Sequence, residues 1–434
     1  MKTLRLEPLD HLAGEVTVPG SKSVSNRALL LAALADGTTR LHNLLRSEDT
    51  AHMIAALQTL GIELDDTPDE VRVTGRAGPL VSRPGHWALY LGLAGTALRP
   101  LTAALTLGQG TFVLDGSPRM RERPLADLVD ALAPLGARIR YLGEQGYPPL
   151  EVTGSGLEGG TTTIRGNVSS QFLTSLLMVA PLAHGPVTVW VEGEQVSKPY
   201  LDITLHMMAQ FGIRVGRRGH AGFSVTPGGY VSPGRYVVEG DASSATYFLA
   251  AGAIRGPGVR VVGLAADSVQ GDARFLEVLA AMGARVERSA DAVTVLPPLS
   301  GRLAAVDLDL NHIPDAAMTA AILGLFASGT TVIRNVGNWR VKETDRLAAM
   351  ALELAKVGAV VEEGADSLRI TAPRRWREAT IDTYGDHRMA MCFSLVALAG
   401  VPVTLRDPDC VAKTFPDYFE RFQSLARPAP GRSA

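Results

Sequence analysis

Residues 21–41 read SKSVSNRALLLAALADGTTRL: a polar start, an apolar run, a glycine and a short strand-like segment. The same pattern begins again at residues 94, 170, 241, 315 and 386. The glycines that close the six apolar runs lie 71 to 75 residues apart, and they are Gly37, Gly110, Gly185, Gly258, Gly329 and Gly400. Such even spacing in a chain of normal complexity predicts that one supersecondary unit is used six times.

A second glycine landmark follows five of the six copies, in QTLGIEL, APLGARI, AQFGIRV, AAMGARV and LAKVGAV. The sixth copy leads instead to DYFERFQSLAR and the C-terminal region, so we predict that the N-terminal segment LRLEPLDHLAGEVTVPG completes the last unit. This threading predicts two domains of three units each, residues 21–239 and residues 1–20 plus 240–434, with crossings near residues 20 and 240. Two domains also suit a chain of 434 residues.

Each unit is expected to contain two helices and short strands, which gives an α/β fold. The first helix is apolar all round and is therefore predicted to be buried. The second is amphipathic, as in LVDALAPLGARI, where Leu128, Leu132 and Leu135 form one stripe. We expect three helix-backed sheets around buried helices in each domain. Converging helix N-termini should attract anions where the domains meet.

Composition narrows the class of protein. The chain is 46% hydrophobic and 20% charged with a formal net charge of −2, which argues against a general nucleic-acid surface. No uncharged apolar run approaches about 18 residues and no secretory leader is recognisable, so a cytoplasmic protein without membrane contact is expected. Cys392 and Cys410 are the only cysteines, and neither they nor the histidines have metal-ligand spacing.

Basic residues recur at or near the predicted helix starts. A solvated surface cation is the common reading for any one of them, but their shared position at repeat boundaries favours a cleft for substrates with phosphates and carboxylates. These residues are Lys22, Arg27, Arg99, Arg119, Arg121, Arg123, Lys342, Arg346, Arg388 and Lys413.

Two acids stand out against these cations, Asp315 in NHIPDAAM and Glu343 in WRVKETDR. Asp315, like Asp241 and Asp386 in their units, could simply cap a helix, and Glu343 could pair with Arg340 or Arg346. Alternatively, the two acids could serve proton transfer in an anion-filled cleft. The residues by themselves leave both readings open.

Ten motifs make the chain resemble one known family. They are PGSKSVSNRALLLAALA, AGTALRPL, PRMRERP, SSQFLTSLLM, VSKPY, EGDASSA, NHIPDAAM, NWRVKETDR, DHRMAM and AKTFPDYF, in order along nearly the whole chain. The sequence is similar to the EPSP synthases, the 3-phosphoshikimate 1-carboxyvinyltransferases, and most resembles the glyphosate-sensitive bacterial type. The resemblance implies the two-domain enolpyruvyl transferase fold, with six βαβαββ-type units, three per domain, closing by a hinge near residues 20 and 240.

The resemblance also implies a transferase of the shikimate pathway to chorismate and the aromatic amino acids. The enolpyruvyl group of phosphoenolpyruvate would move to the 5-hydroxyl of shikimate 3-phosphate with release of phosphate, without metal or organic cofactor, in a monomer. Shikimate 3-phosphate would be held by Lys22, Ser23, Arg27, Ser169, Ser170, Gln171, Ser197, Tyr200, Asp315, Asn338 and Lys342. Phosphoenolpyruvate would be held by Lys22, Gly95, Arg119, Gln171, Arg346, Arg388 and Lys413.

Three of these residues would be catalytic in that reading. Asp315 would accept the proton of the attacking hydroxyl, and Glu343 or Lys22 would protonate the methylene of phosphoenolpyruvate. Gly95 would be needed because a Cβ there would crowd the ligand.

One departure from the family pattern is Leu93 in YLGLAGTALRP, where relatives usually have an asparagine. Loss of that amide predicts weaker phosphoenolpyruvate binding or altered glyphosate sensitivity. Gly385, where many relatives have an asparagine before DHR, is expected to change a turn with little chemical effect.

The main alternative is the sister enzyme that acts on UDP-N-acetylglucosamine, which usually carries a reactive cysteine in its mobile loop. The corresponding loop here reads SPRMRERP, and neither Cys392 nor Cys410 suits that role. A non-catalytic phosphometabolite-binding protein would keep the cations but would not need both Asp315 and Glu343.

Overall fold

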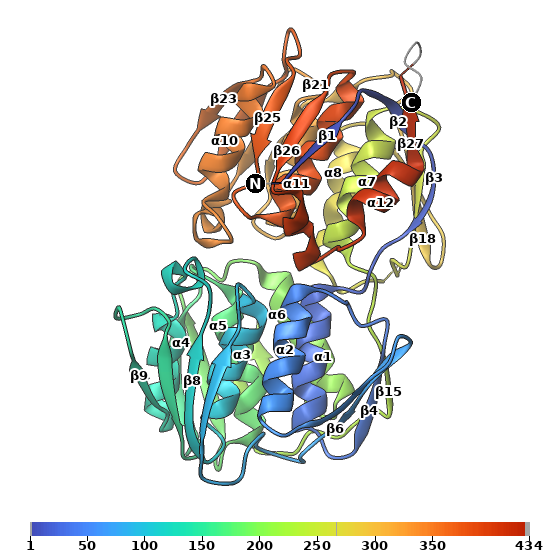
Figure 1. The fold of residues 1–434 in the computed structure, drawn as a ribbon. Helices are drawn as coiled ribbons and strands as arrows, with labels where there is room; N and C mark the ends of the chain where they lie inside the picture. Colours follow the sequence, from blue (N-terminus) through green and yellow to red (C-terminus); the bar gives the residue numbers. More distant parts are fainter. Residues whose placement is uncertain (1, 266, 430–434) are drawn as a thin grey trace. The chain divides into compact units, whose positions relative to one another are not determined.

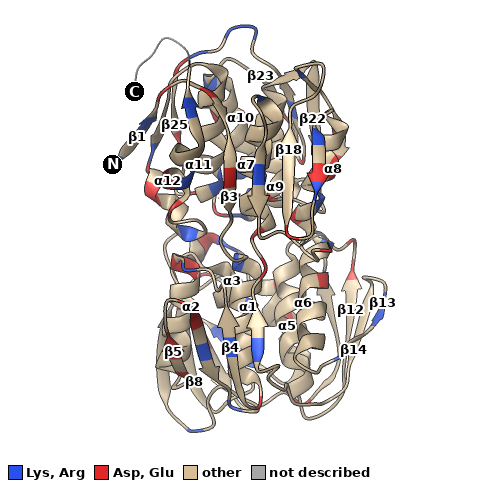
Figure 2. Ribbon diagram, turned by 90° about the vertical axis from the view of Figure 1, so that its right-hand side faces the viewer, with Lys and Arg blue, Asp and Glu red and all other residues tan. Residues whose placement is uncertain are grey.

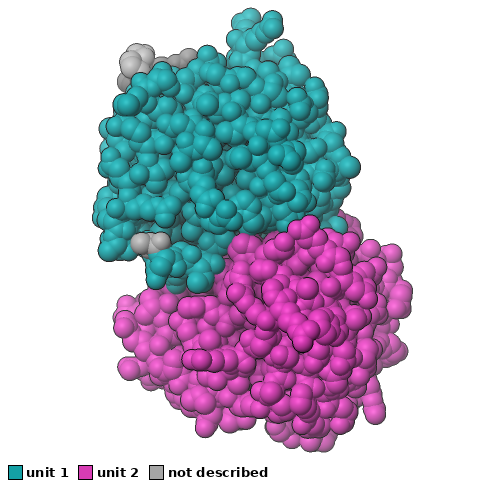
Figure 3. All heavy atoms as spheres, turned by 180° about the vertical axis from the view of Figure 1, so that it is seen from behind, with its two compact units in different colours: residues 1–19, 239–434 teal, residues 20–238 magenta. Residues whose placement is uncertain are grey.

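The computed structural model describes residues 2–265 and 267–429, and its chain divides into two compact units. Unit 1 comprises residues 1–19 and 239–434, and unit 2 comprises residues 20–238 (Figure 3). Both boundaries fall one residue before the positions expected from the repeats. Each unit is described below by itself.

Unit 2 contains three repeats, each with the strand and helix order βαβαββ. The first consists of β15 (Arg235–Val237), α1 (Lys22–Leu34), β4 (Thr38–His42), α2 (Glu48–Thr59), β5 (Glu63–Asp66) and β6 (Glu70–Thr74). The second consists of β7 (His86–Tyr90), α3 (Gly95–Leu105), β8 (Gly110–Asp115), α4 (Ala126–Leu132), β9 (Arg138–Tyr141) and β10 (Leu150–Gly154). The third consists of β11 (Gly160–Arg165), α5 (Ser170–Val179), β12 (Val187–Glu192), α6 (Lys198–Gln210), β13 (Gly216–Arg218) and β14 (Gly222–Val225).

Repeats 4 and 5 of unit 1 have this order with added 3₁₀ turns, whereas repeat 6 has a single strand to complete its sheet after the second helix. Repeat 4 consists of β3 (Gly14–Thr17), α7 (Ala242–Ile254), β16 (Val259–Val262), the 3₁₀ turn η4 (Gly271–Arg274), α8 (Phe275–Ala281), β17 (Arg285–Arg288) and β18 (Ala292–Leu296). Repeat 5 consists of β20 (Asp307–Asp309), α9 (Ala316–Gly324), β22 (Thr330–Arg334), η5 (Gly337–Val341), α10 (Arg346–Lys356), β23 (Val360–Glu363) and β24 (Leu368–Thr371). Repeat 6 consists of β25 (Ala379–Asp382), α11 (His387–Ser394), β26 (Val403–Arg406), η7 (Pro408–Lys413), α12 (Tyr418–Leu425) and β1 (Thr3–Leu6).

The four-stranded sheets of repeats 1 to 5 follow one topology, and repeat 6 has the three-stranded sheet β1-β26-β25. In unit 2 the sheet order β7-β8-β10-β9 joins β7 and β8 in parallel, and the remaining neighbours are antiparallel. The crossover between the parallel strands is the buried helix, as a βαβ connection requires. Two further small sheets in unit 1 pair β2 (Leu9–Leu12) with β27 (Ala426–Pro428) and β19 (Leu303–Ala304) with β21 (Ala327–Ser328).

The first helices of the repeats form the centre of each unit. In unit 2, α3 packs against both α1 and α5 (Figure 1). In unit 1, α9 packs against both α7 and α11. Helices α5, α7 and α9 contain no charged residue and are tan in Figure 2. The predicted stripe of Leu128, Leu132 and Leu135 is fully buried, and α4 packs against α5 and against β11 of the next repeat. Both sequence expectations about the helices are therefore confirmed.

Strands are exchanged between repeats where the chain passes from one unit to the other. β3 leads into α1 of repeat 1 but pairs in parallel with β16 of repeat 4. β15 leads into α7 of repeat 4 but pairs in parallel with β4 of repeat 1. The N-terminal β1 pairs with β26 and completes the sixth unit, as expected (Figure 1). The rest of that prediction is wrong for β3, which lies in the same N-terminal segment but joins the sheet of repeat 4. The exchange itself was not predicted.

The second glycine landmark has a conformational cause. Gly61, Gly136, Gly212, Gly283 and Gly358 all adopt positive φ, between 86° and 103°. A residue in the left-handed region at the end of a helix satisfies the last carbonyls, and only glycine does so without strain. The landmark therefore marks five helix ends. No helix among residues 2–265 and 267–429 is long and apolar enough to cross a membrane.

Candidate active site

The first turns of the buried helices of unit 2 are connected by side chains. Asn26 of α1 donates a hydrogen bond from Nδ2 to Thr96 Oγ1 of α3 at 2.7 Å. Arg99 of α3 donates from Nη1 to Gln171 Oε1 of α5, also at 2.7 Å. The expected convergence of these helix starts is thus present within unit 2. It brings Gln171 beside the positively charged end of α3.

Arg27 connects α1 to α6. Its Nε donates to Thr204 Oγ1 at 2.8 Å, and its Nη1 donates to the Ser23 carbonyl at 2.8 Å. Nη2 lies 3.5 Å from the carbonyl of Tyr200. Burial lowers the pKa of Arg27 to about 10, which still leaves the guanidinium charged at neutral pH. Ser197 precedes α6 in the left-handed region, with φ of 53°, and its carbonyl accepts a hydrogen bond from the Tyr200 N–H at 3.1 Å.

Gly95, the first residue of α3, faces two guanidinium groups. A Cβ at this position would lie 2.6 Å from Arg99 Nη1 and 3.0 Å from Arg123 Nη1. Arg123 is 4% exposed, and its Nη1 lies 3.4 Å from the Leu93 carbonyl. The absence of a side chain at Gly95 therefore makes room for the two arginines, which refines the expectation that it only makes room for a ligand.

Arg119 is placed differently from Arg123. Its side chain is one third exposed, and Nη1 contacts Glu122 Oε2 at 2.7 Å. The structure thus brings Arg123, not Arg119, next to Gly95. Sequence reasoning noted Arg123 as a cation but gave it no role, because spacing alone does not tell which arginine of PRMRERP turns inward.

The remaining predicted residues of unit 2 lie at the starts of α1 and α5. Lys22 is the first residue of α1, and its Nζ lies 3.8 Å from Asp49 Oδ2 on α2. Ser169 caps α5 by accepting a hydrogen bond from the Gln171 N–H, and Ser170 begins the helix. Asp49 was not identified from the sequence. Its position in the first turn of α2 is the usual place for a dipole-stabilising acid.

In unit 1 each buried helix is preceded by an aspartate. Asp386 caps α11 by accepting from the Arg388 N–H at 2.9 Å, whereas Asp315 makes no capping bond to α9. Asp241 precedes α7 and accepts from Ser244 Oγ at 2.6 Å. The capping interpretation therefore holds for Asp386 and fails for Asp315.

Arg346, the first residue of α10, binds three carboxylates. Its side chain is 1% exposed and contacts Asp386 at 2.7 Å, Asp315 at 2.8 Å and Glu343 at 2.9 Å. Burial opposes its charge, but the three acids raise the pKa of Arg346 above its ordinary value. Arg340 pairs with Asp345 and Glu363 instead, so Arg346 is the partner of Glu343. We call Arg346 with its three carboxylates the acidic cluster.

Arg388 gives Asp315 a second cation. Its Nη2 donates to Asp315 Oδ2 at 2.8 Å, and its Nη1 contacts the hydroxyl of Tyr247 at 3.2 Å. Burial acts to raise the pKa of Asp315, but the charges of Arg388, Lys342 and Arg346 hold it well below its usual range. Asp315 is therefore ionised at neutral pH, and its two oxygens are oriented by two arginines.

Three further predicted residues of unit 1 lie on 3₁₀ turns or directly after one. Asn338 belongs to η5 and Lys342 follows it, and this turn is anchored because the buried Trp339 donates from Nε1 to the Pro314 carbonyl at 2.6 Å. Pro314 directly precedes Asp315, so the turn and the acid are held together. Lys413 ends η7 and is 4% exposed.

The comparisons with known proteins agree with this arrangement. Residues 6–422 match the family described as EPSP synthase (3-phosphoshikimate 1-carboxyvinyltransferase). The chain belongs to the EPSP synthase family. A 3-phosphoshikimate 1-carboxyvinyltransferase of Vibrio cholerae serotype O1 (strain M66-2) is 59% identical over 98% of this chain and 100% of its own length. One of Shewanella baltica (strain OS185) is 58% identical with the same coverage.

Solved structures extend the similarity to the fold. An EPSP synthase from Acinetobacter baumannii superposes with a TM-score of 0.81 at 27% identity, covering 98% of each chain. The enolpyruvyl transferase NikO from Streptomyces tendae gives a TM-score of 0.78 at 22% identity, covering 98% of this chain and 97% of its own, which supports the fold alone. The two-unit, six-repeat architecture is thus the enolpyruvyl transferase fold, as predicted.

The cysteines differ from what the sister enzyme on UDP-N-acetylglucosamine would need. Burial raises the pKa of both Cys392 and Cys410 to about 12, so neither is a thiolate at neutral pH. Among residues 2–265 and 267–429, no cluster of histidine, cysteine and acidic side chains has the form of a metal site.

Proposed function

We propose that the chain transfers the enolpyruvyl group of phosphoenolpyruvate to the 5-hydroxyl of shikimate 3-phosphate, the reaction of the family to which it belongs, with the acidic cluster supplying the base. The observation that carries the proposal is Asp315, which is buried, ionised and oriented by Arg346 and Arg388. A purely structural ion pair would not require one carboxylate to be shared by two buried arginines at the start of a helix it does not cap.

Shikimate 3-phosphate is assigned to hydroxyl, amide and cationic groups of both units. In unit 2, Arg27 offers charge, and the hydroxyls beside it suit the ring oxygens and phosphate of the substrate. The proposed contacts are Lys22, Ser23, Arg27, Ser169, Ser170, Gln171, Ser197 and Tyr200 from unit 2, with Asp315, Asn338 and Lys342 from unit 1.

Phosphoenolpyruvate is assigned mainly to arginine and lysine side chains, because their positive charge would balance the carboxylate and phosphate of this small anion. Unit 2 contributes Lys22, Gly95 and Gln171 together with Arg123, which replaces Arg119 because it is the buried neighbour of Gly95. Unit 1 contributes Arg346, Arg388 and Lys413. These cations also stabilise the negative charge that develops as phosphate departs.

Substrate binding would change the basicity of Asp315. In the structure its low pKa makes it a weak base, because Arg388, Lys342 and Arg346 stabilise its charge. When the phosphoenolpyruvate anion shares Arg346 and Arg388, part of that stabilisation is lost and the pKa of Asp315 must rise. The carboxylate is therefore converted into a better proton acceptor by the substrate itself.

The reaction balances as an addition followed by an elimination. The 5-hydroxyl oxygen attacks C2 of phosphoenolpyruvate, its proton passes to Asp315, and C3 takes a proton from Glu343 or Lys22. The tetrahedral intermediate then returns a C3 proton to the group that gave it, Glu343 or Lys22, and loses phosphate, which restores the carbon–carbon double bond. Glu343 contacts Arg346, and the Nζ of Lys22 lies 3.8 Å from Asp49 Oδ2. Each candidate proton donor therefore has a charged neighbour that can influence its proton transfer.

The test is phosphate release from phosphoenolpyruvate by purified protein with shikimate 3-phosphate, with UDP-N-acetylglucosamine, or without acceptor. Release with shikimate 3-phosphate alone supports the proposal. Release with the sugar nucleotide would assign the chain to the sister reaction. No release with any acceptor, despite tight binding of shikimate 3-phosphate, would indicate a binding protein and overturn the catalytic assignment.

A further inference from the structure

Tyr247 is a buried polar side chain to which neither the sequence motifs nor the proposed mechanism give a role. It lies on α7, a helix without charged residues, and is 1% exposed. Its hydroxyl oxygen accepts a hydrogen bond from Arg388 Nη1 at 3.2 Å. Helix α7 belongs to repeat 4, whereas α11, which carries Arg388, belongs to repeat 6. The tyrosine therefore reaches a site residue that lies in a different repeat.

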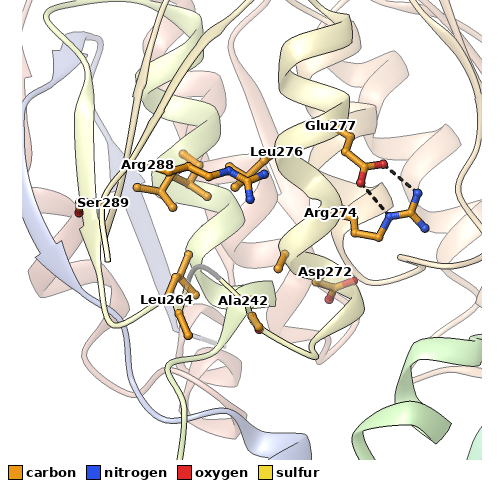
Figure 4. A pocket seen from close by; sticks show the side chains of 13 residues that line it. Ala242, Leu264, Asp272, Arg274, Leu276, Glu277, Arg288 and Ser289 are labelled. Atoms are coloured by element: carbon orange, nitrogen blue, oxygen red, sulfur yellow. Dashed lines mark hydrogen bonds and ion pairs between the residues drawn. The ribbon is translucent and has the colours of Figure 1, made fainter. Parts of the chain in front are cut away.

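The direction of Tyr247 follows from the helical period. At about 3.6 residues per turn, its side chain points roughly 140° to 160° away from those of Ala242 and Leu249 on the same helix. Those two residues contribute to the wall of a pocket of about 130 Å³, where Arg274 and Glu277 pair with each other (Figure 4). Tyr247 thus faces away from this pocket and its ion pair, and toward the other buried helices of unit 1.

Contacts beside Tyr247 fix the register of these helices. The Oγ1 atoms of Thr246 on α7 and Thr319 on α9 lie 2.8 Å apart and share a hydrogen bond. Thr319 Oγ1 also lies 3.8 Å from Cys392 Sγ on α11. Thr319 follows Asp315 by one helical turn, and Cys392 follows Arg388 by one turn. The same contacts therefore align the helix starts at which this acid and this arginine meet.

The ring of Tyr247 is held by a second tyrosine. Tyr418 packs against it edge to face, with ring centroids 5.8 Å apart and an interplanar angle of 79°. The hydroxyl of Tyr418 is itself fixed on α11, because it lies 2.8 Å from Ser394 Oγ and donates to the Met391 carbonyl at 3.2 Å. The position of the Tyr247 hydroxyl is therefore determined by packing around the ring as well as by the arginine.

The hydroxyl contacts Arg388 without cancelling its charge. Burial raises the pKa of Tyr247 well above its ordinary value, although the charge of Arg388 acts in the opposite direction, so the phenol is neutral at neutral pH. A neutral oxygen can accept a hydrogen bond from a guanidinium, whereas a carboxylate in its place would also compete with a bound anion. Arg346 shows the contrast, since its nitrogens contact three carboxylates.

We propose that Tyr247 is a positioning residue that acts through Arg388. Its hydroxyl holds Nη1 of the guanidinium in place, so that Nη2 stays directed at Asp315 and the positive charge remains available to the phosphoenolpyruvate anion. The inference deepens the proposed function and rests on it, because it takes Arg388 as a phosphoenolpyruvate contact.

The test measures kcat and KM for both substrates in the wild type and in Tyr247→Phe. This variant loses one hydroxyl and keeps the ring that packs against Tyr418, and its melting temperature verifies that it is folded. KM for phosphoenolpyruvate should rise by about tenfold, the effect of one hydrogen bond to a charged group. KM for shikimate 3-phosphate and kcat should each change by less than about threefold. A loss of folded protein would lower kcat alone, so an unchanged KM for phosphoenolpyruvate would overturn the inference.

Tyr418→Phe is the matched control. It removes a buried hydroxyl from the same aromatic pair, but that hydroxyl contacts Ser394 and a backbone carbonyl instead of Arg388. Both KM values should stay at the wild-type level. An equal rise in KM for phosphoenolpyruvate in Tyr418→Phe would assign the effect to packing of the pair and would contradict a specific role of the Tyr247 hydroxyl.

A double-mutant cycle with Arg388→Gln tests whether the tyrosine acts through the arginine. In the Arg388→Gln background, Tyr247→Phe should raise KM for phosphoenolpyruvate no further, because the hydroxyl then has no guanidinium to hold. A further tenfold rise would overturn the inference. If Arg388→Gln by itself leaves this KM unchanged, the proposed function of the arginine fails and the inference fails with it. If Arg388→Gln raises KM and Tyr247→Phe does not, only the inference fails.

Discussion

The two units have the same repeated architecture but different residues at the starts of their buried helices. The N-cap positions are Asp241, Asp315 and Asp386 in unit 1, and Ser21, Ala94 and Ser169 in unit 2. One backbone arrangement therefore presents three carboxylates in one unit and none in the other. The helix dipoles are equivalent, so the side chains decide the electrostatics.

The arginines of the two units reflect this difference. In unit 1, Arg346 contacts three carboxylates, whereas in unit 2 Arg27 donates to a threonine hydroxyl and to backbone carbonyls. Among the described residues, the contacts of Arg27 therefore include no carboxylate, whereas Arg346 is paired with three acids and orients them. We infer that unit 1 supplies the proton-transfer groups together with cations that the anion must share with those acids, and that unit 2 supplies cations and hydroxyls for anion binding.

The strongest test of this contrast is Asp315→Asn. Removal of the base should lower turnover by about 10² to 10⁴, while binding of shikimate 3-phosphate remains measurable by titration. Asp307→Asn is the control, since Asp307 is an exposed acid of the same unit that pairs with Arg334. Near-normal turnover in Asp315→Asn would break the assignment of proton transfer to unit 1.

The second test compares single substitutions of the two candidate arginines of unit 2. Arg123→Gln should raise KM for phosphoenolpyruvate by at least about tenfold, because a buried hydrogen bond to a charged group is worth about 1.5 to 3 kcal/mol. Arg119→Gln should change it by less than about threefold, since Arg119 is partly exposed beside Glu122. The reverse order would restore the sequence-based choice of Arg119.

The third test adds a methyl group at Gly95. Gly95→Ala should raise KM for phosphoenolpyruvate by about tenfold, because its Cβ would displace Arg99 and Arg123. Shikimate 3-phosphate affinity should change less. Gly143→Ala is the matched control, since its Cβ would make only an ordinary contact with Pro149 at 3.5 Å. Equal KM values in the two variants would show that the positions of Arg99 and Arg123 do not limit phosphoenolpyruvate binding.

The smallest expected effect is that of Leu93→Asn. The new amide would belong to the residue whose carbonyl accepts a hydrogen bond from Arg123. Phosphoenolpyruvate should therefore bind about threefold to tenfold more tightly, and glyphosate inhibition should change. The gain is partly offset because Leu93 packs against the core of unit 2. Leu93→Met keeps the apolar volume and should leave both constants unchanged. Unchanged constants in Leu93→Asn would show that the missing amide has no effect.

The places of several candidate site residues in the fold were predictable because these residues lie at fixed positions in a repeat. The capping and helix-start positions of Lys22, Ser170, Asp315 and Arg388 follow from local sequence alone. The choice between capping and catalysis for Asp315 was not predictable, since it depends on arginines 31 and 73 residues away. The inward turn of Arg123 was missed for the same reason.

The sequence by itself determined the number of repeats, their helices and strands, the helix-ending glycines and the division near residues 20 and 240, because these depend on hydrophobic period and backbone conformation within about 20 residues. Only the tertiary structure decided that β3 pairs with β16 and that Arg346 contacts three acids. Strand pairing and charge pairing depend on distances between segments remote in the chain, and the energy of a charge pair changes steeply with separation and burial. Those distances exist only once the repeats have packed.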